Sequence, residues 1–457
     1  MLEKEAYDKC GVMGIFNVQN PAGNLYLGLH NIQHRGQGGC GIMTASKRKI
    51  HSAYGKGIVN DAFSKSTLKK LKGRSGIGHV IYPTVGFSST NNKQPIVGET
   101  NNGIVGVAHN GQILNYERLR KELKKGGSDF KTKSDTEVIL KKFAKAKGNS
   151  LEEILFDTFK DIRPSYSIVM LTKNELIGIK DPSGVRPLAI GYIIDKNAYV
   201  LASESVAFDI IGAKHIGEVE RGEAVIIDDK GLRRKQLFNK EKEQKCIFES
   251  IYFSRPDSMI YGDQITTSII RKEFGKQLYR ESPTKADIVI PVPDSSIDAA
   301  LGYSYESGIP FDWGFVRNHY IGRTFIQPTQ TIIDADIMKK LNVNKSVVDK
   351  KKVIIVDDSI VRSSTIKKII RLIKDGGAKE VHIKASSPPY KHSCNLGIET
   401  SKKKRLIANE RSVKEIGKII DATSLHYLSK QGMLNNRHLR GKFCTYCFDG
   451  KEVIKKE

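Results

Sequence analysis

Two adjacent carboxylates followed by a run of hydroxyl side chains form the stretch of this sequence best suited to chemistry. Asp357 and Asp358 come directly after four β-branched residues, 353–356, which are typical of a strand buried on both faces. A helix-like pattern covers 366–373, and the turn before it carries three hydroxyl residues, Ser363, Ser364 and Thr365. Backbone N–H groups and hydroxyls at a helix start bind phosphate, whereas carboxylates at a strand end bind ribose hydroxyls or a metal ion. An ordinary strand ending in solvated acids is the alternative.

A second unit of the same kind lies earlier in the chain. Residues 286–293 predict another buried strand, and a helical pattern follows at 297–303. The turn between them contains small polar residues that suit an anion such as a diphosphate, namely Asp294, Ser295 and Ser296. The basic, glycine-containing loop 317–328 lies between the two units and can close over bound phosphates, although an ordinary surface loop would look similar.

An early cysteine gives the other end of the chain a different chemistry. Cys10 follows nine largely polar residues and precedes a small, apolar strand pattern at 11–16. If residues 1–9 are a propeptide that is removed, the α-amine of Cys10, with an ordinary pKa of about 7.7–8.0, can act as the base for its own thiol. A lone early cysteine is more often a small buried residue. Here polar motifs accompany it, at 33–37, 78–84, 108–111 and 134–137.

The length, charge and linker composition of the chain predict the domains that must position these groups. The 457 residues predict two or three domains, and the apolar runs are too short for a membrane span or a signal peptide, so we expect a cytoplasmic protein. A net charge of +25 raises the possibility of nucleic-acid binding. The lysines, however, lie in short clusters without interleaved aromatic residues, so we expect no nucleic-acid partner and assign part of the charge to steering of a polyanionic substrate. Strand patterns run to about residue 231, and the charged segment 239–243 predicts a boundary between domains 10–238 and 239–457.

Together these motifs resemble the amidophosphoribosyltransferase family. Residues 353–365 resemble the signature of type I phosphoribosyltransferases, which bind 5-phosphoribosyl 1-diphosphate (PRPP), and Cys10 with its accompanying motifs looks like a class II glutamine amidotransferase domain. Further matches cover 181–187, 202–205, 252–258 and 322–326. The resemblance implies an α+β N-terminal domain with a four-layer αββα fold of the N-terminal-nucleophile type. It implies an α/β C-terminal phosphoribosyltransferase domain built on a parallel sheet.

The family resemblance also implies a reaction and its partners. Cys10 would release ammonia from glutamine through a thioester, and ammonia would displace diphosphate from PRPP. The products are 5-phosphoribosylamine, glutamate and diphosphate, in the first step of de novo purine (IMP) synthesis. The family further implies a homo-oligomer, either a tetramer or a dimer.

Site residues carry over where the motifs match. Cys10 would be the nucleophile, Asn110 and the backbone N–H of Gly111 would form an oxyanion hole worth about 3 kcal/mol, and Asp135 would bind the amino group of glutamine. Magnesium and PRPP would be held by Ser295, Asp357 and Asp358, and the diphosphate would lie near Asp294, Ser296 and Lys340. The 5-phosphate would bind Ser363, Ser364 and Thr365.

The cysteines add a cofactor. Cys444 and Cys447 have the close spacing of paired metal ligands, and spacing alone suits a tetrahedral zinc site or simply buried thiols. With Cys246 and Cys394 they resemble the four ligands of the iron–sulfur subgroup of the family, which implies a 4Fe-4S cluster of structural or oxygen-sensing role. Cys40 is expected to be a packed small residue.

Two positions depart from the family pattern. Ile81 stands where the family has an arginine that pairs with the α-carboxylate of glutamine, a loss of about 1.5–3 kcal/mol unless Arg35 or Arg74 replaces it. Ser363 stands where the phosphate loop usually has glycine. The alternatives to the full reaction are therefore a transferase that uses free ammonia because its glutaminase is impaired, and a non-catalytic regulator that binds PRPP or a nucleotide.

Overall fold

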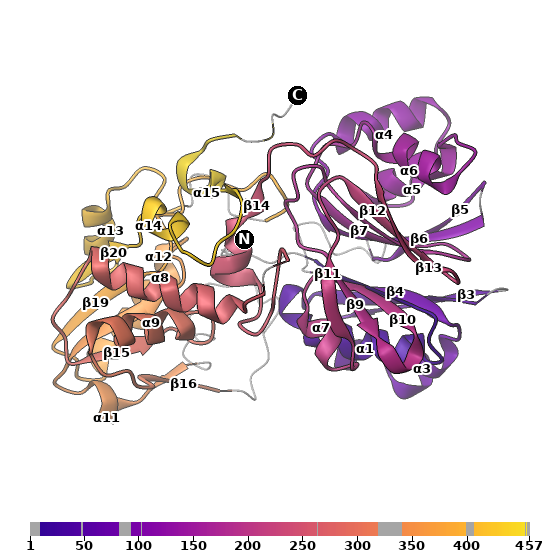
Figure 1. Ribbon diagram of the computed structural model, residues 1–457. Coiled ribbons are helices and arrows are strands. Elements are labelled where there is room, and N and C mark those ends of the chain that lie inside the picture. The colour runs from indigo at the N-terminus through magenta and orange to yellow at the C-terminus, as the bar shows by residue number, and fades with distance from the viewer. Residues whose placement is uncertain are drawn as a thin grey trace.

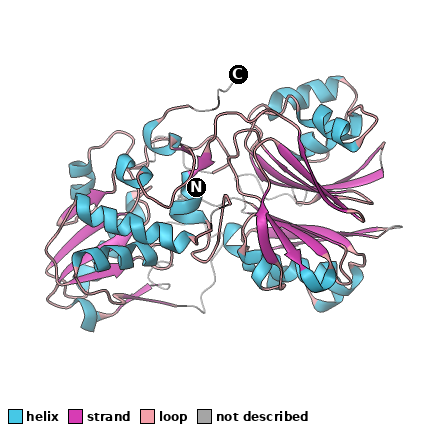
Figure 2. Cartoon of the chain, viewed as in Figure 1, coloured by secondary structure: helices cyan, strands magenta, loops and turns pink. Residues whose placement is uncertain are grey.

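A computed structural model describes residues 10–46, 49–81, 93–101, 103–262, 264–318, 341–398, 406–452 and 454. The chain forms two domains that lie side by side, the first made mainly of two facing sheets and the second of one sheet between helices (Figure 1; Figure 2). No helix among the described residues is both long and apolar enough to cross a bilayer.

The first sheet of the N-terminal domain is antiparallel and places Cys10 at the start of a central strand. Its strand order is β11-β9-β10-β1-β4-β2-β3. The strands are β1 (Gly11–Phe16), β2 (Gly39–Ala45), β3 (Ile50–Lys56), β4 (Ser75–Ile81), β9 (Ala189–Ile193), β10 (Ala198–Ala202) and β11 (Lys214–Glu218). Four helices cover its outer face: α1 (Pro21–Asn31), α2 (Val59–Ala62), α3 (Lys65–Lys70) and α7 (Val206–Asp209). The short 3₁₀ turns η1 (Gln33–Arg35) and η3 (Ile194–Lys196) lie at the edges.

The second sheet faces the first and is also antiparallel, in the order β13-β12-β8-β7-β6-β5. Its strands are β5 (Ile96–Thr100), β6 (Gly103–Gly111), β7 (Tyr166–Leu171), β8 (Leu176–Lys180), β12 (Glu223–Asp228) and β13 (Gly231–Gln236). Its outer face packs on α4 (Tyr116–Lys125), α5 (Thr136–Lys145) and α6 (Leu151–Phe159). Apolar residues such as Val12, Ile77 and Val169 fill the space between the sheets. The αββα fold expected from the sequence is thus confirmed (Figure 1).

The second domain is built on a four-stranded parallel sheet in the order β15-β18-β19-β20, which confirms the predicted architecture. The strands are β15 (Ile288–Pro291), β18 (Lys352–Asp357), β19 (Glu380–Ala385) and β20 (Ser424–Tyr427). One face packs on α8 (Thr267–Glu281) and α9 (Ile297–Ser307), and the other on α12 (Ser363–Asp375) and α13 (Val413–Ile419). Alternate residues of β18 enter the two cores, Ile354 and Val356 the first, Val353 and Ile355 the second, as its β-branched run predicts.

Short elements complete the domain and join it to the first. They are β14 (Lys245–Cys246), the π-helix η4 (Glu249–Phe253), β16 (Phe315–Arg317), β17 (Leu341–Val343), α11 (Lys345–Val348), α14 (Lys430–Leu434), β21 (Phe443–Cys444) and α15 (Tyr446–Asp449). The charged segment after β13 stays on the first domain, since the N–H of Glu241 donates to Pro182 O at 3.1 Å and that of Gln244 to Ser183 O at 2.9 Å. The boundary at residue 239 remains a prediction.

Lys384 is a buried cation in the core of the second domain. Its side chain leaves β19 fully shielded from solvent, and Nζ donates to the carbonyl oxygen of Ser282 at 2.6 Å and to its hydroxyl at 3.0 Å, at the end of α8. Burial lowers the pKa of Lys384 to about 8. Below pH 8 Lys384 carries its proton in both the folded and the unfolded chain, so the folded state bears the full cost of burying the charge. Between that pH and the ordinary lysine pKa only the unfolded chain keeps the proton. The free energy of unfolding therefore rises with pH over this range.

Replacing this cation tests that balance. Lys384→Met should raise the free energy of unfolding by about 2 kcal/mol at pH 7, because an apolar side chain of similar length avoids the charge penalty, and the gain should shrink towards pH 10.5. Denaturant unfolding at both pH values measures it, with the exposed Lys379→Met as the matched control. A loss of stability at pH 7 would show that the bonds to Ser282 outweigh the burial penalty.

Candidate active sites

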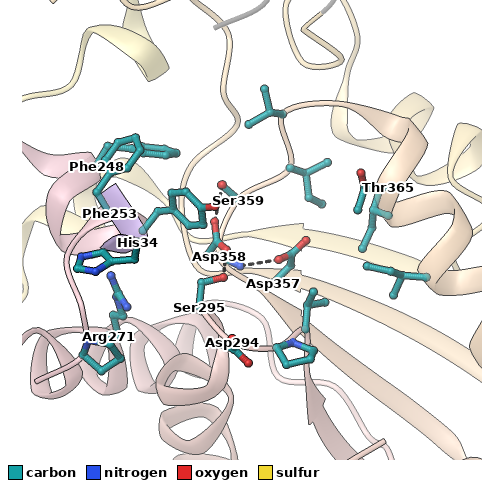
Figure 3. A pocket seen from close by; sticks show the side chains of 18 of the residues that line it. His34, Phe248, Phe253, Arg271, Asp294, Ser295, Asp357, Asp358, Ser359 and Thr365 are labelled. Carbon is teal, nitrogen blue, oxygen red and sulfur yellow. Dashed lines mark hydrogen bonds between the residues drawn. The ribbon is translucent and has the colours of Figure 1, made fainter. Parts of the chain in front are cut away.

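A cavity of about 510 Å³ opens at the carboxyl ends of β15 and β18. Its wall contains Asp294, Ser295, Asp357, Asp358, Ser359 and Thr365. Figure 3 shows Ser295, Asp357, Asp358 and Ser359 close together, with Thr365 further along the cavity on α12. The sequence placed these residues on separate strand and turn units. The parallel sheet brings them together because β15 and β18 are neighbours, with Pro291 opposite Val356.

The two carboxylates are held in different surroundings. Asp358 is buried, and its oxygens accept from the hydroxyls of Ser295 at 2.5 Å and Ser359 at 2.6 Å. Asp357 is only partly buried and accepts from the hydroxyl of Ser296 at 3.3 Å and from the Asp358 N–H at 2.9 Å. Burial raises the pKa of Asp358, even though Ser295, Ser359 and Arg271 favour the charged form. A bound cation would restore that charged form, so the pair suits a divalent ion with oxygen ligands.

The start of α12 supplies the expected place for a phosphate. Ser363, Ser364 and Thr365 form its first turn, and the N-cap residue Arg362 makes no side-chain capping bond to it. Thr365 and Arg362 line the cavity, whereas Ser363 and Ser364 lie beside that lining in the described part of the chain. Backbone N–H groups and hydroxyls at a helix start are a general anion site.

Of the basic residues that line this cavity, Arg271 was not found from the sequence. Arg271 of α8 is buried and donates through Nη2 to Ser254 O at 2.7 Å and through Nε to Ser250 O at 3.0 Å. Arg317 pairs with Asp294, and His34 reaches the cavity from the other domain. The local sequence does not mark Arg271, which meets the site through tertiary packing, whereas Arg317 begins the basic loop 317–328 and His34 lies in the motif 33–37. Lys340 and most of the loop 317–328 lie outside the described residues.

Cys10 immediately precedes β1, which lies between β4 and β10, and its carbonyl oxygen accepts from Nε of Arg35 at 3.3 Å. The rest of the Arg35 guanidinium is occupied: Nη1 and Nη2 each lie 3.0 Å from an oxygen of Glu249, and Nη1 also pairs with Glu204. Burial opposes the charge on Glu204, yet His34 and Arg35 hold its pKa at about 2. Arg35 is 1% exposed. Its expected role in binding glutamine stays a prediction; in this structure Arg35 is bound to two glutamates and to the backbone of Cys10.

Asn110 and Gly111 end β6 in the facing sheet, and their strand is tied to β4 by His79. Burial lowers the pKa of His79 to about 3, so its neutral ring donates from Nε2 to His109 O at 3.2 Å. Both side-chain polar atoms of Asn110 are fully buried without a hydrogen-bond partner among the described residues. A buried unpaired amide is costly and suits a donor reserved for a substrate oxygen.

Asp135, expected to bind the amino group of glutamine, lies at the start of α5 near the same strand end. Its Oδ2 accepts from the N–H of Ile113 at 3.0 Å, and its Oδ1 lies 3.7 Å from Nδ1 of His109. Burial opposes ionisation, but His109 and the backbone amides hold the pKa of Asp135 below its ordinary value. A charged carboxylate at this place can pair with an ammonium group.

The two arginines considered as replacements for the missing arginine at position 81 both have other partners in this structure. Ile81 is buried at the end of β4, where its carbonyl accepts from the N–H of Gly38 at 2.8 Å. Arg74 precedes the first residue of β4, about 20 Å away along the strand, and binds Asn17 at 2.6 Å. Arg35 is held by two glutamates.

Four cysteines from three distant segments line one small cavity, together with the fully buried Arg186. They are Cys246, Cys394, Cys444 and Cys447, and β14 and β21 pair in parallel so that Cys246 lies opposite Cys444. Burial, then the neighbouring Cys246, raises the pKa of Cys444 to about 12. No group of three or more metal-binding side chains within reach of a single ion occurs among the described residues. No disulfide joins any of the six cysteines, and Cys40 packs in the core of the first sheet as expected.

Comparison with known proteins agrees with both domains. Residues 84–209 match the glutamine amidotransferase domain family, and residues 262–415 match the phosphoribosyl transferase domain family. The chain is 41% identical to the amidophosphoribosyltransferase of Bacillus subtilis, with 97% of this chain and 94% of that one covered. It is 42% identical to the chloroplastic amidophosphoribosyltransferase 1 of Arabidopsis thaliana, with 99% and 80% covered.

A solved structure shares the whole architecture. The glutamine PRPP amidotransferase from Bacillus subtilis, complexed with ADP and GMP, superposes with a TM-score of 0.90 at 40% identity, and 98% of each chain is covered. The fold and the two sites thus define an amidotransferase domain fused to a phosphoribosyltransferase domain. The chain belongs to the amidophosphoribosyltransferase family.

Proposed function

We propose that this protein transfers ammonia from glutamine to PRPP, giving 5-phosphoribosylamine, glutamate and diphosphate, the first step of purine synthesis. The observation that carries the proposal is the shared wall of the two sites: Arg35 holds the Cys10 carbonyl, and the adjacent His34 lines the cavity of the paired carboxylates. The single turn η1 thus contacts both the nucleophile and the cavity in which ammonia would be used.

In the glutaminase step the chain's own groups carry the proton and the charge. Once residues 1–9 are removed, the α-amine of Cys10 takes the thiol proton, and sulfur attacks the side-chain amide carbon of glutamine. The amide of Asn110 and the N–H of Gly111 hold the oxyanion, while Asp135 holds the ammonium group of the substrate. The amine returns its proton to the leaving ammonia, and water then hydrolyses the thioester.

In the transferase step the protein positions PRPP for attack at its anomeric carbon. The first turn of α12 would take the 5-phosphate, and the turn at 294–296 the diphosphate. Ser295, Asp357 and Asp358 would hold Mg²⁺, which neutralises the diphosphate as it leaves. Burial raises the pKa of Asp358, and a bound cation would favour its charged form, which fits a site completed by a cation.

Diphosphate release from PRPP and Mg²⁺, with saturating glutamine or with ammonium chloride, tests the activity. Release with both nitrogen sources supports the proposal. Release with ammonia alone favours the second candidate, an ammonia-dependent transferase, for which Ile81 is the specific observation. Release with neither would leave a PRPP-binding or nucleotide-binding regulator.

Ile81→Arg should lower the KM for glutamine by about 10- to 100-fold with little change in the ammonia-dependent rate, because a guanidinium can bind the α-carboxylate through two hydrogen bonds. Steady-state kinetics with each nitrogen source measure the effect. Ile81→Met, which changes the side chain without adding charge, is the control. An unchanged KM would mean that another group already holds the carboxylate.

We further propose a 4Fe-4S cluster in the four-cysteine cavity, with zinc as the weaker alternative. Four thiols and a buried arginine whose Nε has no partner among the described residues suit an anionic cluster better than four neutral thiols. Bound there, the cluster would supply a cross-link between three segments. Protein purified without oxygen should contain about four iron and four sulfide per chain, and Cys447→Ser should lose both. One zinc per chain and no sulfide would favour the alternative.

We also propose a homo-oligomer, a dimer or a tetramer, that works in the cytoplasm without a nucleic-acid partner. The resemblance to the family supports the assembly, and the scattered lysines support the lack of a nucleic-acid site. Sedimentation equilibrium gives the number of chains. Retention on a DNA column that survives high salt would contradict the last point.

A further inference from the structure

Arg186 connects the four-cysteine cavity to a buried ionic chain. It is fully shielded from solvent, lines the cavity, and places Nη1 3.5 Å from an oxygen of Glu249. Its Nη2 donates to the carbonyl oxygen of Leu396, two residues after Cys394, and its Nε is buried without a partner among the described residues. A buried cation in the wall of a thiol-lined cavity is favoured when those thiols carry the negative charge of metal ligands.

Glu249 links Arg186 to Arg35, which in turn contacts the nucleophile Cys10. Its two oxygens accept from Arg35 at 3.0 Å each, a fork-to-fork geometry that fixes both planes. Arg35 in turn donates from Nε to the carbonyl oxygen of Cys10. Each of the three charged side chains is at most 1% exposed, so solvent screens their interactions little. The chain Arg186–Glu249–Arg35 therefore runs from the cavity to the backbone of Cys10.

A second connection reaches the oxyanion strand from the segment 394–398. The N–H of Leu396 donates to Sγ of Cys394 at 3.3 Å, and its carbonyl oxygen accepts from Oγ of Ser165 at 2.7 Å. Ser165 is paired with Gln112, the residue after Gly111, through two backbone bonds of 2.8 Å. Gly397, with φ of +95°, approaches so closely that a Cβ there would lie 2.9 Å from the carbonyl carbon of Gly111. Only a glycine fits this contact.

We propose that the four-cysteine cavity positions the glutaminase site, with Arg186 and Glu249 as positioning residues that act on Cys10 and the segment 394–398 acting on the oxyanion strand at Gly111. Figure 1 shows the elements that carry these cysteines, β14 and α15, between the two domains. A metal cluster bound by Cys394 would fix that segment, and through it the strand that ends at Gly111. The inference rests on the proposed glutaminase role of Cys10, and it implies that the transferase step does not depend on Arg186.

Full-length protein purified without oxygen tests this with Arg186→Gln, Arg186→Lys and the control Arg221→Gln, whose side chain pairs with Glu243 and does not line the cavity. The first readout is the rate at which a diazoketone analogue of glutamine labels Cys10, followed by the mass of the Cys10 peptide. The second is diphosphate release with ammonia. The third is the midpoint potential of the bound metal centre.

Arg186→Gln should slow the labelling about tenfold or more, leave the ammonia-dependent rate within about twofold, and shift the midpoint potential to more negative values, because a positive charge near the centre is lost. Arg186→Lys should restore the potential but only part of the labelling rate, since lysine keeps the charge without the fork. Arg221→Gln should change none of these. Unchanged labelling in Arg186→Gln, or a parallel fall of the ammonia-dependent rate, would overturn the proposal.

Ser165→Ala keeps the test decisive if Arg186→Gln does not fold. This substitution removes the hydrogen bond from Ser165 to the carbonyl oxygen of Leu396. It should slow the labelling of Cys10 about threefold or more and preserve the ammonia-dependent rate. An unchanged labelling rate would again overturn the proposal. Wild-type protein that releases no diphosphate with ammonia would mark a failure of the proposed function. The labelling rates would still decide the positioning role.

Discussion

Cys10→Ser should abolish glutamine-dependent diphosphate release, by at least about a thousandfold, and leave the ammonia-dependent rate unchanged. A serine hydroxyl is a far weaker nucleophile than a thiol at neutral pH, and the α-amine cannot deprotonate it to a comparable extent. The transferase cavity is formed by other residues and does not require the thiol. Parallel assays with the two nitrogen sources measure the separation, together with the mass of the mature N-terminus.

Cys40→Ser is the matched control, because Cys40 is buried in the core of the first sheet and its pKa is raised to about 12 by burial and then by Asp61. It should lower stability without changing the ratio of the two activities. If Cys10→Ser retained its glutamine-dependent rate, the nucleophile would have to be a different residue.

Asp358→Asn should remove both activities, by about 10² to 10⁴, while the protein remains folded. The substitution keeps the shape of the side chain but removes the charge that would bind Mg²⁺ and oppose the diphosphate. The raised pKa of Asp358 means that the folded protein gains little from this buried charge, so thermal stability should not fall. Diphosphate release with each nitrogen source and the melting temperature form the two measurements.

The exposed Asp375→Asn at the end of α12 serves as its control, since its pair with Arg371 is solvent-exposed and contributes little. Loss of stability without loss of activity in Asp358→Asn would contradict the assignment. A loss confined to the glutamine reaction would point to a role between the two domains instead.

The sheets and the residues at strand ends could be predicted from the sequence because their signals are local. Four β-branched residues before Asp357 predicted β18, and helical periodicity after Thr365 predicted α12. The parallel pairing of β15 with β18 then brings Ser295 to Asp358 without further assumption.

The buried charge pairs could not be predicted, because their partners are far apart in the chain. Arg35 was expected to face a substrate, yet it meets Glu204 and Glu249, which are 169 and 214 residues away. Local sequence marks neither glutamate as a partner of an arginine. The same is true of Arg271 in the transferase cavity, which comes from helix α8.

The parallel pairing of β14 with β21 also sets the order of events during synthesis. The two amidotransferase sheets are complete once β13 has left the ribosome, but Cys246 cannot meet Cys444 and Cys447 until almost the whole chain has emerged. At ordinary rates of translation that interval is roughly 10 to 40 seconds. The β14–β21 pair and the bond from Ser165 to Leu396 can therefore form only after most of the second domain has been synthesised.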